Sequence, residues 1–121
     1  MSKILIIDDE APVRKMLKKL LERNEFDVIE AIDGNQGIKM YHEERPDLII
    51  TDLIMPGKEG LESIRELKKI YPHVQIIAIS GGGFVDPKMY LDLASKLGAV
   101  RTFAKPVDSD ILLSTIKELL A

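Results

Sequence analysis

The sequence predicts an α/β fold in which helices cover both faces of a doubly wound parallel sheet. Five short apolar runs recur along the chain, and stretches with helical spacing of apolar residues separate them. Three of the runs are continuous Ile, Leu and Val without alternating polar residues, as is typical of parallel strands buried on both faces. Strands that alternate with helices favour right-handed crossovers in one sheet. We expect a single domain over residues 1–121.

The apolar runs are the expected strands. They lie at residues 4–7, 26–29, 48–50, 74–79 and 100–103.

The first two intervals between the runs have the spacing of helices. Apolar residues three and four positions apart begin at Val13 and form one stripe, and Asn24 is placed to end that helix. The interval 35–44 is the weakest helix, because Gly34 and Gly37 lie in or beside it.

The later helices are marked by their ends. Pro72 stops one apolar stripe, and Gly98 is a helix-ending glycine after another. Pro87 suits the first turn of the fourth helix. Either Asp108 or Ser109 is available to cap the last helix.

Composition excludes several functional classes. The 17 basic and 20 acidic residues give a net charge of −3 and are interleaved, which argues against direct nucleic-acid binding. The absence of cysteine excludes a thiol nucleophile, a zinc-thiolate site and redox switching. Neither a signal peptide nor a membrane span is apparent, so we expect a cytoplasmic protein with no membrane partner.

Polar residues follow four of the expected strands. Asp8 and Asp9 come after the first strand, Asp52 after the third, Ser80 after the fourth and Lys105 after the fifth. In open α/β sheets the ligand site forms outside the carboxyl ends of the strands. We therefore expect these five side chains to share one edge of the sheet.

Such a cluster of carboxylates indicates a bound cation. Two carboxylates about 5 Å apart repel by about 3 kcal/mol at an effective dielectric constant of about 20. Oxygen ligands without histidine or thiolate suit a hard divalent ion, and a shallow site favours Mg²⁺ over Ca²⁺. Lys105 offers a second positive charge to a bound phosphoryl group. Ser80 and the backbone N–H groups of Leu53 and Gly81 are candidate donors to its oxygens.

Each residue also has a simpler interpretation when taken singly. Asp8 or Asp9 alone suits a helix cap, and Asp52 alone suits a turn. Ser80 before three glycines suits a loop, and Lys105 suits the solvated surface. These separate interpretations do not explain the joint arrangement.

Four other residues are expected to have no functional role. His42 and His73 are interpreted as surface residues, and Met16 and Met40 as core residues.

Four segments together resemble the receiver domain of two-component response regulators. They are ILIIDDE at 4–10, DLIITDLIMPGKEG at 47–60, IIAISG at 76–81 and FAKP at 103–106. The resemblance covers essentially the whole chain. It implies a flavodoxin-like sheet of five strands in the order 2-1-3-4-5 with five helices.

The resemblance implies a phosphoacceptor with a metal site. Asp52 would accept a phosphoryl group from the phosphohistidine of a sensor kinase or phosphotransfer protein. Asp9 would bind Mg²⁺ directly, Asp8 would bind it largely through water, and the Asp52 carboxylate and the backbone carbonyl of Ile54 would be further ligands. The output would pass to a downstream protein or to an effector domain outside this sequence. A homodimer through the fourth helix, fifth strand and fifth helix is a further option.

The resemblance also implies a switch. Lys105 would pair with Asp52 and then with the phosphoryl group, through a loop in which the bond to Pro106 is cis. Ser80 would move toward the phosphoryl oxygens. At the position where the family usually has Tyr or Phe this chain has Thr102, and Phe103 is expected on the opposite side of the strand. We therefore expect activation to depend on movement of residues 81–85.

Two other functions remain as alternatives. An aspartyl-phosphate phosphatase or phosphotransferase would use Asp52 as its nucleophile. Enzymes that resemble the haloacid dehalogenase group carry a second Asp two residues later, where this chain has Ile54. A flavin or small-ligand module would need a hydroxyl-rich phosphate loop after the first strand, and this sequence has acidic residues there.

Overall fold

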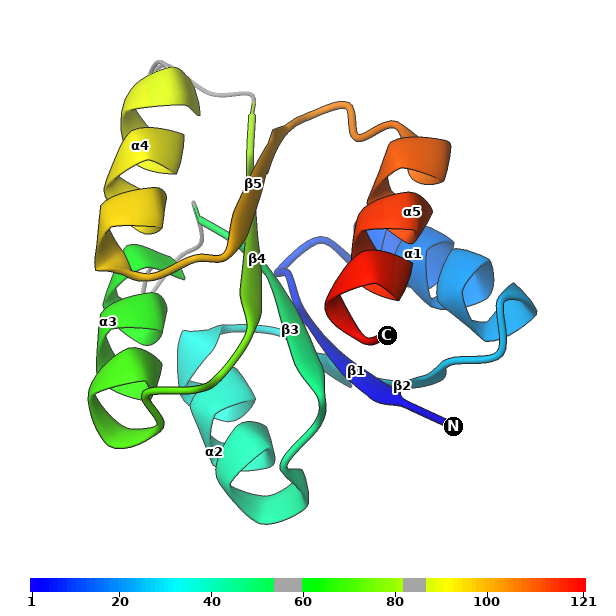
Figure 1. Cartoon of the computed structure of the whole chain (residues 1–121), viewed down its shortest axis with the longest axis horizontal. Helices are drawn as coiled ribbons and strands as arrows, with labels where there is room; N and C mark the ends of the chain where they lie inside the picture. Colours follow the sequence, from blue (N-terminus) through cyan, green and yellow to red (C-terminus); the bar gives the residue numbers. More distant parts are fainter. Residues whose placement is uncertain (54–59, 82–86) are drawn as a thin grey trace.

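The computed structural model describes residues 1–53, 60–81 and 87–121, and it confirms the predicted parallel sheet (Figure 1). Five parallel strands are ordered β2-β1-β3-β4-β5. The strands are β1 (Lys3–Ile7), β2 (Asp27–Ala31), β3 (Leu48–Asp52), β4 (Ile76–Ser80) and β5 (Arg101–Ala104). The helices are α1 (Ala11–Arg23), α2 (Gly34–Glu44), α3 (Gly60–Ile70), α4 (Pro87–Leu97) and α5 (Ser109–Leu119).

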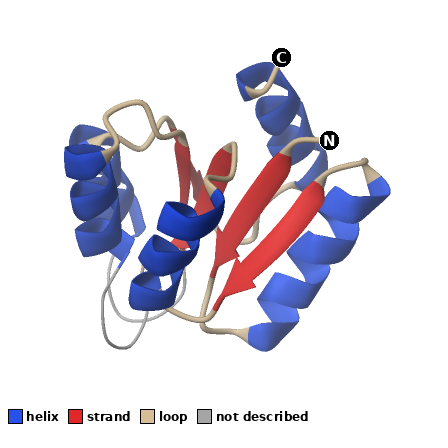
Figure 2. Ribbon diagram, turned by 90° about the horizontal axis from the view of Figure 1, so that it is seen from below, coloured by secondary structure: helices blue, strands red, loops and turns tan. Residues whose placement is uncertain are grey.

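Helices cover both faces of the sheet (Figures 1 and 2). In Figure 1, α1 and α5 lie on one side of the strands, and α2, α3 and α4 lie on the other. The two faces have separate cores because successive strand residues point to opposite sides. The α1 and α5 face buries the strand residues Ile4, Ile6, Leu48, Ile50, Ile77 and Ile79. The opposite face buries the strand residues Leu5, Ile7, Ala31, Ile49, Ile76 and Ala78.

Several predicted helix ends are confirmed. Asn24 is the C-cap of α1, where its backbone N–H donates to the carbonyl oxygens of the last turn. Asp108 is the N-cap of α5, and its carboxylate accepts from the N–H groups of Asp110 and Ile111. Of the two caps that the sequence allowed for α5, the structure therefore selects Asp108. The weakly predicted second helix is also present, as α2.

Each of the five strands differs from its predicted range by one or two residues at one end or both, and the shifts in β2 and β4 have a clear cause. β2 ends at Ala31, two residues beyond the predicted end, because its pairing with β1 continues to that residue. β4 begins at Ile76, because Val74 donates to the carbonyl oxygen of Tyr71 in the turn that follows α3. Val74 is nevertheless buried, which explains its apolar character.

The side chains of β5 point as predicted. Phe103 packs against the core under α1 and α5. Thr102 is in register with Ala78, which belongs to the opposite core.

One predicted core residue is wrong. Met16 is 55% exposed, whereas Leu17 and Leu21 of the same helix are buried. The buried face of α1 is thus narrower than its apolar stripe, and Met16 lies at the edge of the stripe. Met40 packs against the core, and His42 and His73 are exposed, as predicted.

No helix in the three described ranges is both long enough and apolar enough to cross a bilayer.

Candidate functional site

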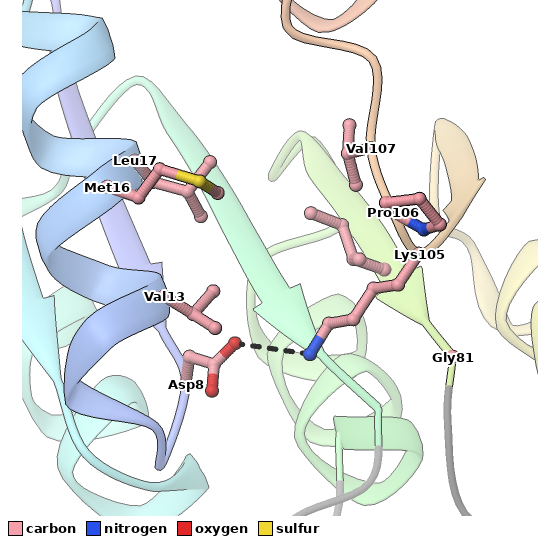
Figure 3. A pocket seen from close by; sticks show the side chains of 9 residues that line it. Asp8, Val13, Met16, Leu17, Gly81, Lys105, Pro106 and Val107 are labelled. Carbon is pink, nitrogen blue, oxygen red and sulfur yellow. Dashed lines mark ion pairs between the residues drawn. The ribbon is translucent and has the colours of Figure 1, made fainter.

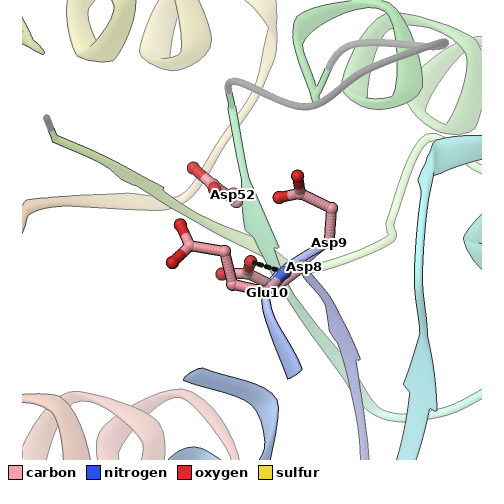
Figure 4. A group of neighbouring side chains, drawn as sticks. All are labelled: Asp8, Asp9, Glu10 and Asp52. Atoms are coloured by element: carbon pink, nitrogen blue, oxygen red, sulfur yellow. Dashed lines mark hydrogen bonds between the residues drawn. The ribbon is translucent and has the colours of Figure 1, made fainter. Parts of the chain in front are cut away.

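The carboxyl ends of the strands bring the predicted polar residues together. Asp52 is the last residue of β3 and Ser80 is the last residue of β4. Asp8 directly follows β1, and Lys105 directly follows β5. All four strands run parallel, so their ends meet at one edge of the sheet, where Figure 4 shows the acidic side chains.

Four carboxyl groups form a tight cluster at this edge (Figure 4). One ligand oxygen from each of Asp8, Asp9, Glu10 and Asp52 lies within 4.8 Å of the others. Asp8 and Asp52 are buried, while Asp9 and Glu10 are exposed. The cluster thus has two carboxylates held inside the protein and two that face solvent.

Lys105 brings a positive charge into the cluster. Its Nζ lies 3.2 Å from Oδ2 of Asp52, 3.7 Å from Oδ2 of Asp8 and 3.9 Å from Oε1 of Glu10. Burial lowers the pKa of Lys105, but the carboxylates of Asp52, Asp8 and Glu10 outweigh burial and raise the pKa above its ordinary value. The lysine therefore stays charged at neutral pH. Glu10 was not among the site residues predicted from the sequence, although it continues the acidic run after β1.

The carboxyl group of Asp8 is unfavourably placed for a negative charge. The pKa of Asp8 is raised from 3.8 to about 6, mainly by burial and further by the neighbouring Asp52 carboxylate. The Glu10 N–H, which donates to Oδ1 of Asp8 at 2.9 Å, and the Lys105 ammonium partly offset these effects. Neither Asp8 nor Asp9 caps α1, because the N-cap residue is Glu10, without a side-chain cap bond.

Close backbone packing holds Asp52 in place. The N–H of Gly60, at the start of α3, donates to the carbonyl oxygen of Leu53 at 3.1 Å. A side chain at position 60 would meet the carbonyl oxygen of Asp52 at 2.3 Å, so only glycine allows this approach. The N–H of Leu53 donates to the carbonyl oxygen of Ile79 at 3.0 Å. This N–H, a predicted phosphoryl donor, is therefore already engaged in the sheet.

Ser80 has an unused hydrogen-bonding group at the same edge. Its side chain is fully buried, and within the described residues its Oγ is the buried side-chain polar atom that lacks a hydrogen-bond partner. A buried hydroxyl without a partner is unfavourable by about 1–3 kcal/mol. This orphaned donor is suited to an acceptor that arrives from outside the protein.

The loop that carries Lys105 packs directly on the end of β4. The backbone N–H of Lys105 donates to the carbonyl oxygen of Ser80 at 2.9 Å. A Cβ atom at Gly81 would meet Cβ of Lys105 at 2.6 Å. The peptide bond between Lys105 and Pro106 is cis, as the resemblance implied.

An apolar cavity of about 440 Å³ adjoins the cluster, with Asp8 and Lys105 at its polar end (Figure 3). Its other lining residues are Val13, Met16, Leu17, Ile79, Gly81, Pro106 and Val107. The cavity lies between α1 and the segment that joins β5 to α5. It accounts for the exposure of Met16, which borders this opening.

The donor set fits a hard divalent cation. All four groups offer carboxylate oxygens, which Mg²⁺ prefers, and two of them already face solvent. A cation here would also stabilise the ionised form of Asp8 against burial and against the repulsion from Asp52, which both raise its pKa. The predicted ligand Ile54 and the predicted mobile loop beyond Gly81 lie outside the described residues.

Fold and site together define a class: a flavodoxin-like α/β domain with an acidic cluster at the carboxyl ends of its strands. The family model for the response regulator receiver domain matches residues 4–117. The chain belongs to this family, as its sequence motifs suggested.

Two curated proteins of Bacillus subtilis (strain 168) are similar over nearly their whole length. Chemotaxis protein CheY is 37% identical over 119 residues, which cover 98% of this chain and 97% of that protein. Sporulation initiation phosphotransferase F is 31% identical over 118 residues, which cover 98% and 93%. Among solved structures, a response regulator receiver domain protein from Clostridium thermocellum has a TM-score of 0.91 and 35% identity, covering 98% of this chain and 94% of that chain.

Proposed function

We propose that this receiver domain accepts a phosphoryl group on Asp52 and changes its partner binding in response. The observation that supports the proposal is the arrangement of Asp52 itself. Its carboxylate is buried within a cluster of three other carboxyl groups, and a lysine ammonium lies 3.2 Å away. A carboxylate can accept a phosphoryl group only where the combined negative charge is neutralised.

In the proposed transfer, an Asp52 oxygen attacks the phosphorus of a phosphohistidine on a sensor kinase or phosphotransfer protein. An oxygen–phosphorus bond forms and the nitrogen–phosphorus bond breaks, so the imidazole leaves with the electron pair. The product is an acyl phosphate. Lys105 pairs with Asp52 before transfer and with a phosphoryl oxygen afterwards, which stabilises the charge that builds up.

The carboxylates of Asp8, Asp9 and Asp52 are the proposed metal ligands, with the backbone carbonyl of Ile54 as a fourth. When bound, Mg²⁺ would supply a positive charge to the phosphoryl oxygens. The position of the Asp8 carboxyl group is fixed by its burial and by the hydrogen bond that Oδ1 accepts from the Glu10 N–H.

The Ser80 hydroxyl is the proposed switch. Because its Oγ has no partner within the described residues, it gains a hydrogen bond when a phosphoryl oxygen arrives. That gain exists only in the phosphorylated state, so it shifts the balance between two conformations. The backbone N–H of Gly81 is a second proposed donor. With Thr102 in place of an aromatic ring, we expect the signal to pass through residues 81–85.

Receiver domains are signalling proteins that interact with histidine kinases and effectors. For this chain, binding to a sensor kinase or phosphotransfer protein, an output to a downstream protein or effector domain, and a homodimer through α4, β5 and α5 remain predictions. A single domain over residues 1–121 and a cytoplasmic location remain predictions as well. An aspartyl-phosphate phosphatase is the weaker candidate, because Ile54 stands where that chemistry places a second Asp.

The proposal is tested with acetyl phosphate as a small phosphoryl donor in the presence of Mg²⁺. We expect the intact mass to rise by one phosphoryl group per chain, with the added group lost in hydroxylamine. Asp52→Asn should abolish the gain, and Asp92→Asn, an exposed change on α4, should leave it intact. Continuous release of phosphate over many turnovers would instead favour the phosphatase. Labelling of Asp52→Asn equal to that of the wild type would contradict both the receiver proposal and the phosphatase alternative.

A further inference from the structure

Arg14 reaches back from the first turn of α1 to the turn that carries the acidic cluster. Its Nη1 donates to the main-chain carbonyl oxygen of Asp8 at 2.7 Å. Its Nε lies 3.5 Å from Oε1 of Glu30 on β2. The Arg14 side chain is only 15% exposed, so solvent screens these contacts weakly. Hydrogen bonds from a guanidinium are charge-assisted and are roughly twice as strong as neutral ones.

The carbonyl that Arg14 holds belongs to the peptide unit between Asp8 and Asp9. A peptide unit is planar and turns as one body, so holding its carbonyl oxygen also fixes the position of its N–H and of the Cα atom of Asp9. The Asp9 side chain makes no hydrogen bond or ion pair with the residues that the structure describes. Its orientation toward the cluster therefore depends on the backbone that Arg14 holds.

Two further polar groups of Asp8, its N–H and its Oδ1, are held by backbone groups. Its N–H donates to the carbonyl oxygen of Ala31 at 3.2 Å, and its Oδ1 accepts from the Glu10 N–H at 2.9 Å. Arg14 binds the main-chain carbonyl oxygen. The other carboxylate oxygen of Asp8, Oδ2, faces Nζ of Lys105 at 3.7 Å. Arg14 thus completes a set of contacts that leaves one carboxylate oxygen of Asp8 directed into the site.

Arg14 acts by its position more than by its charge. Glu30 lies beside its guanidinium, and Lys18 approaches the second oxygen of Glu30 at 3.7 Å. The charged side chains that act on the Asp8 carboxyl group are Asp52, Lys105 and Glu10. The Arg14 charge is thus balanced on the β2 side, away from the cluster.

We propose that Arg14 is a positioning residue for the cation site: its bond to the Asp8 carbonyl presets the Asp8 and Asp9 carboxylates for a divalent ion. The inference rests on the proposed function. Contacts around metal ligands commonly contribute about 10–100-fold to metal affinity, which sets the size of the expected effect.

The test measures Mg²⁺ affinity by titration of the backbone amide NMR signals of residues 8–10. We expect Arg14→Met to weaken Mg²⁺ binding by about tenfold or more. Arg14→Lys keeps a charged donor and should recover part of the lost affinity. Arg23→Met removes an arginine from the exposed last turn of the same helix and should change nothing.

A second measurement separates positioning from general destabilisation. Urea unfolding in EDTA should show Arg14→Met folded at the titration temperature, and the rate with acetyl phosphate should approach the wild-type rate at saturating Mg²⁺. Glu30→Gln weakens the ion pair that holds Arg14 without removing the arginine, so it should give a smaller loss of Mg²⁺ affinity. This variant replaces Arg14→Met in the test if Arg14→Met is too unstable to titrate. Equal Mg²⁺ affinity in wild type, Arg14→Met and Glu30→Gln would overturn the inference alone, whereas a wild type that binds no Mg²⁺ would overturn the proposed function.

Discussion

Asp8 occupies a position in the site where the folded protein disfavours the ionised form of its carboxyl group. Its carboxyl group is buried beside Asp52, and its pKa is raised to about 6. The native protein therefore holds a proton on Asp8 more tightly than the unfolded chain does. Between the two pKa values, a rise in pH makes the native state less stable relative to the unfolded state.

We predict that Asp8→Asn stabilises the metal-free protein at neutral pH. The difference between about 6 and 3.8 corresponds to a gain of at most about 3 kcal/mol in the free energy of unfolding. The gain should be fully present above pH 6 and should vanish as the pH falls below about 4, because Asp8 is then protonated in both states. Urea unfolding in EDTA across this pH range measures it, with Asp92→Asn as the control. A neutral-pH Asp8→Asn less stable than the wild type would contradict the prediction.

At the scale of elements, the junction between β3 and α3 decides where Asp52 sits. The first turn of α3 rests on the last residues of β3, and Gly60 makes this approach possible. The obstacle to a larger residue is backbone, which cannot move without shifting the strand that carries the acceptor. A glycine is thus required here by packing, since a Cβ atom at this position would meet the carbonyl oxygen of Asp52 at 2.3 Å.

Gly60→Ala should lower the free energy of unfolding by about 1–3 kcal/mol, the usual result of overpacking. Gly37→Ala is a matched control, because it is also a buried helical glycine whose added Cβ would meet only the Ile7 side chain. A side chain can rotate away and alanine favours helix, so we expect a smaller loss. Urea unfolding compares the two. A loss in Gly37→Ala as large as that in Gly60→Ala would show that backbone contact is not the deciding factor.

At the scale of the whole molecule, the site exists only because the sheet is assembled. Its charged groups come from positions 8–10, 52 and 105, which are far apart in the sequence and meet only at the carboxyl ends of β1, β3 and β5. An unfolded chain cannot present these groups together. A cation that binds the cluster therefore stabilises the folded state by mass action.

Mg²⁺ should raise the urea midpoint of the wild-type protein in proportion to the logarithm of its concentration. At a concentration 100-fold above the dissociation constant, the stabilisation should reach about 2.7 kcal/mol. Asp9→Asn should reduce the effect, and KCl at matched ionic strength should not reproduce it. An Asp9→Asn variant with the full Mg²⁺ response would remove Asp9 from the set of ligands.

Local patterns in the sequence were enough to predict the class of fold and most of the candidate site. Continuous Ile, Leu and Val runs indicate strands buried on both faces, and polar residues after such runs must lie at one edge. The strand order came from the family resemblance, because periodicity does not specify which strands are neighbours.

Tertiary structure alone decided which groups come into contact and which do not. It exposed Met16 beside a cavity, brought Glu10 to Lys105, left the Ser80 hydroxyl without a partner within the described residues and placed Arg14 on the Asp8 carbonyl. These features depend on distances between segments that are remote along the chain. A sequence specifies the burial preference of each residue directly, but it specifies such distances only through the packing of the whole molecule.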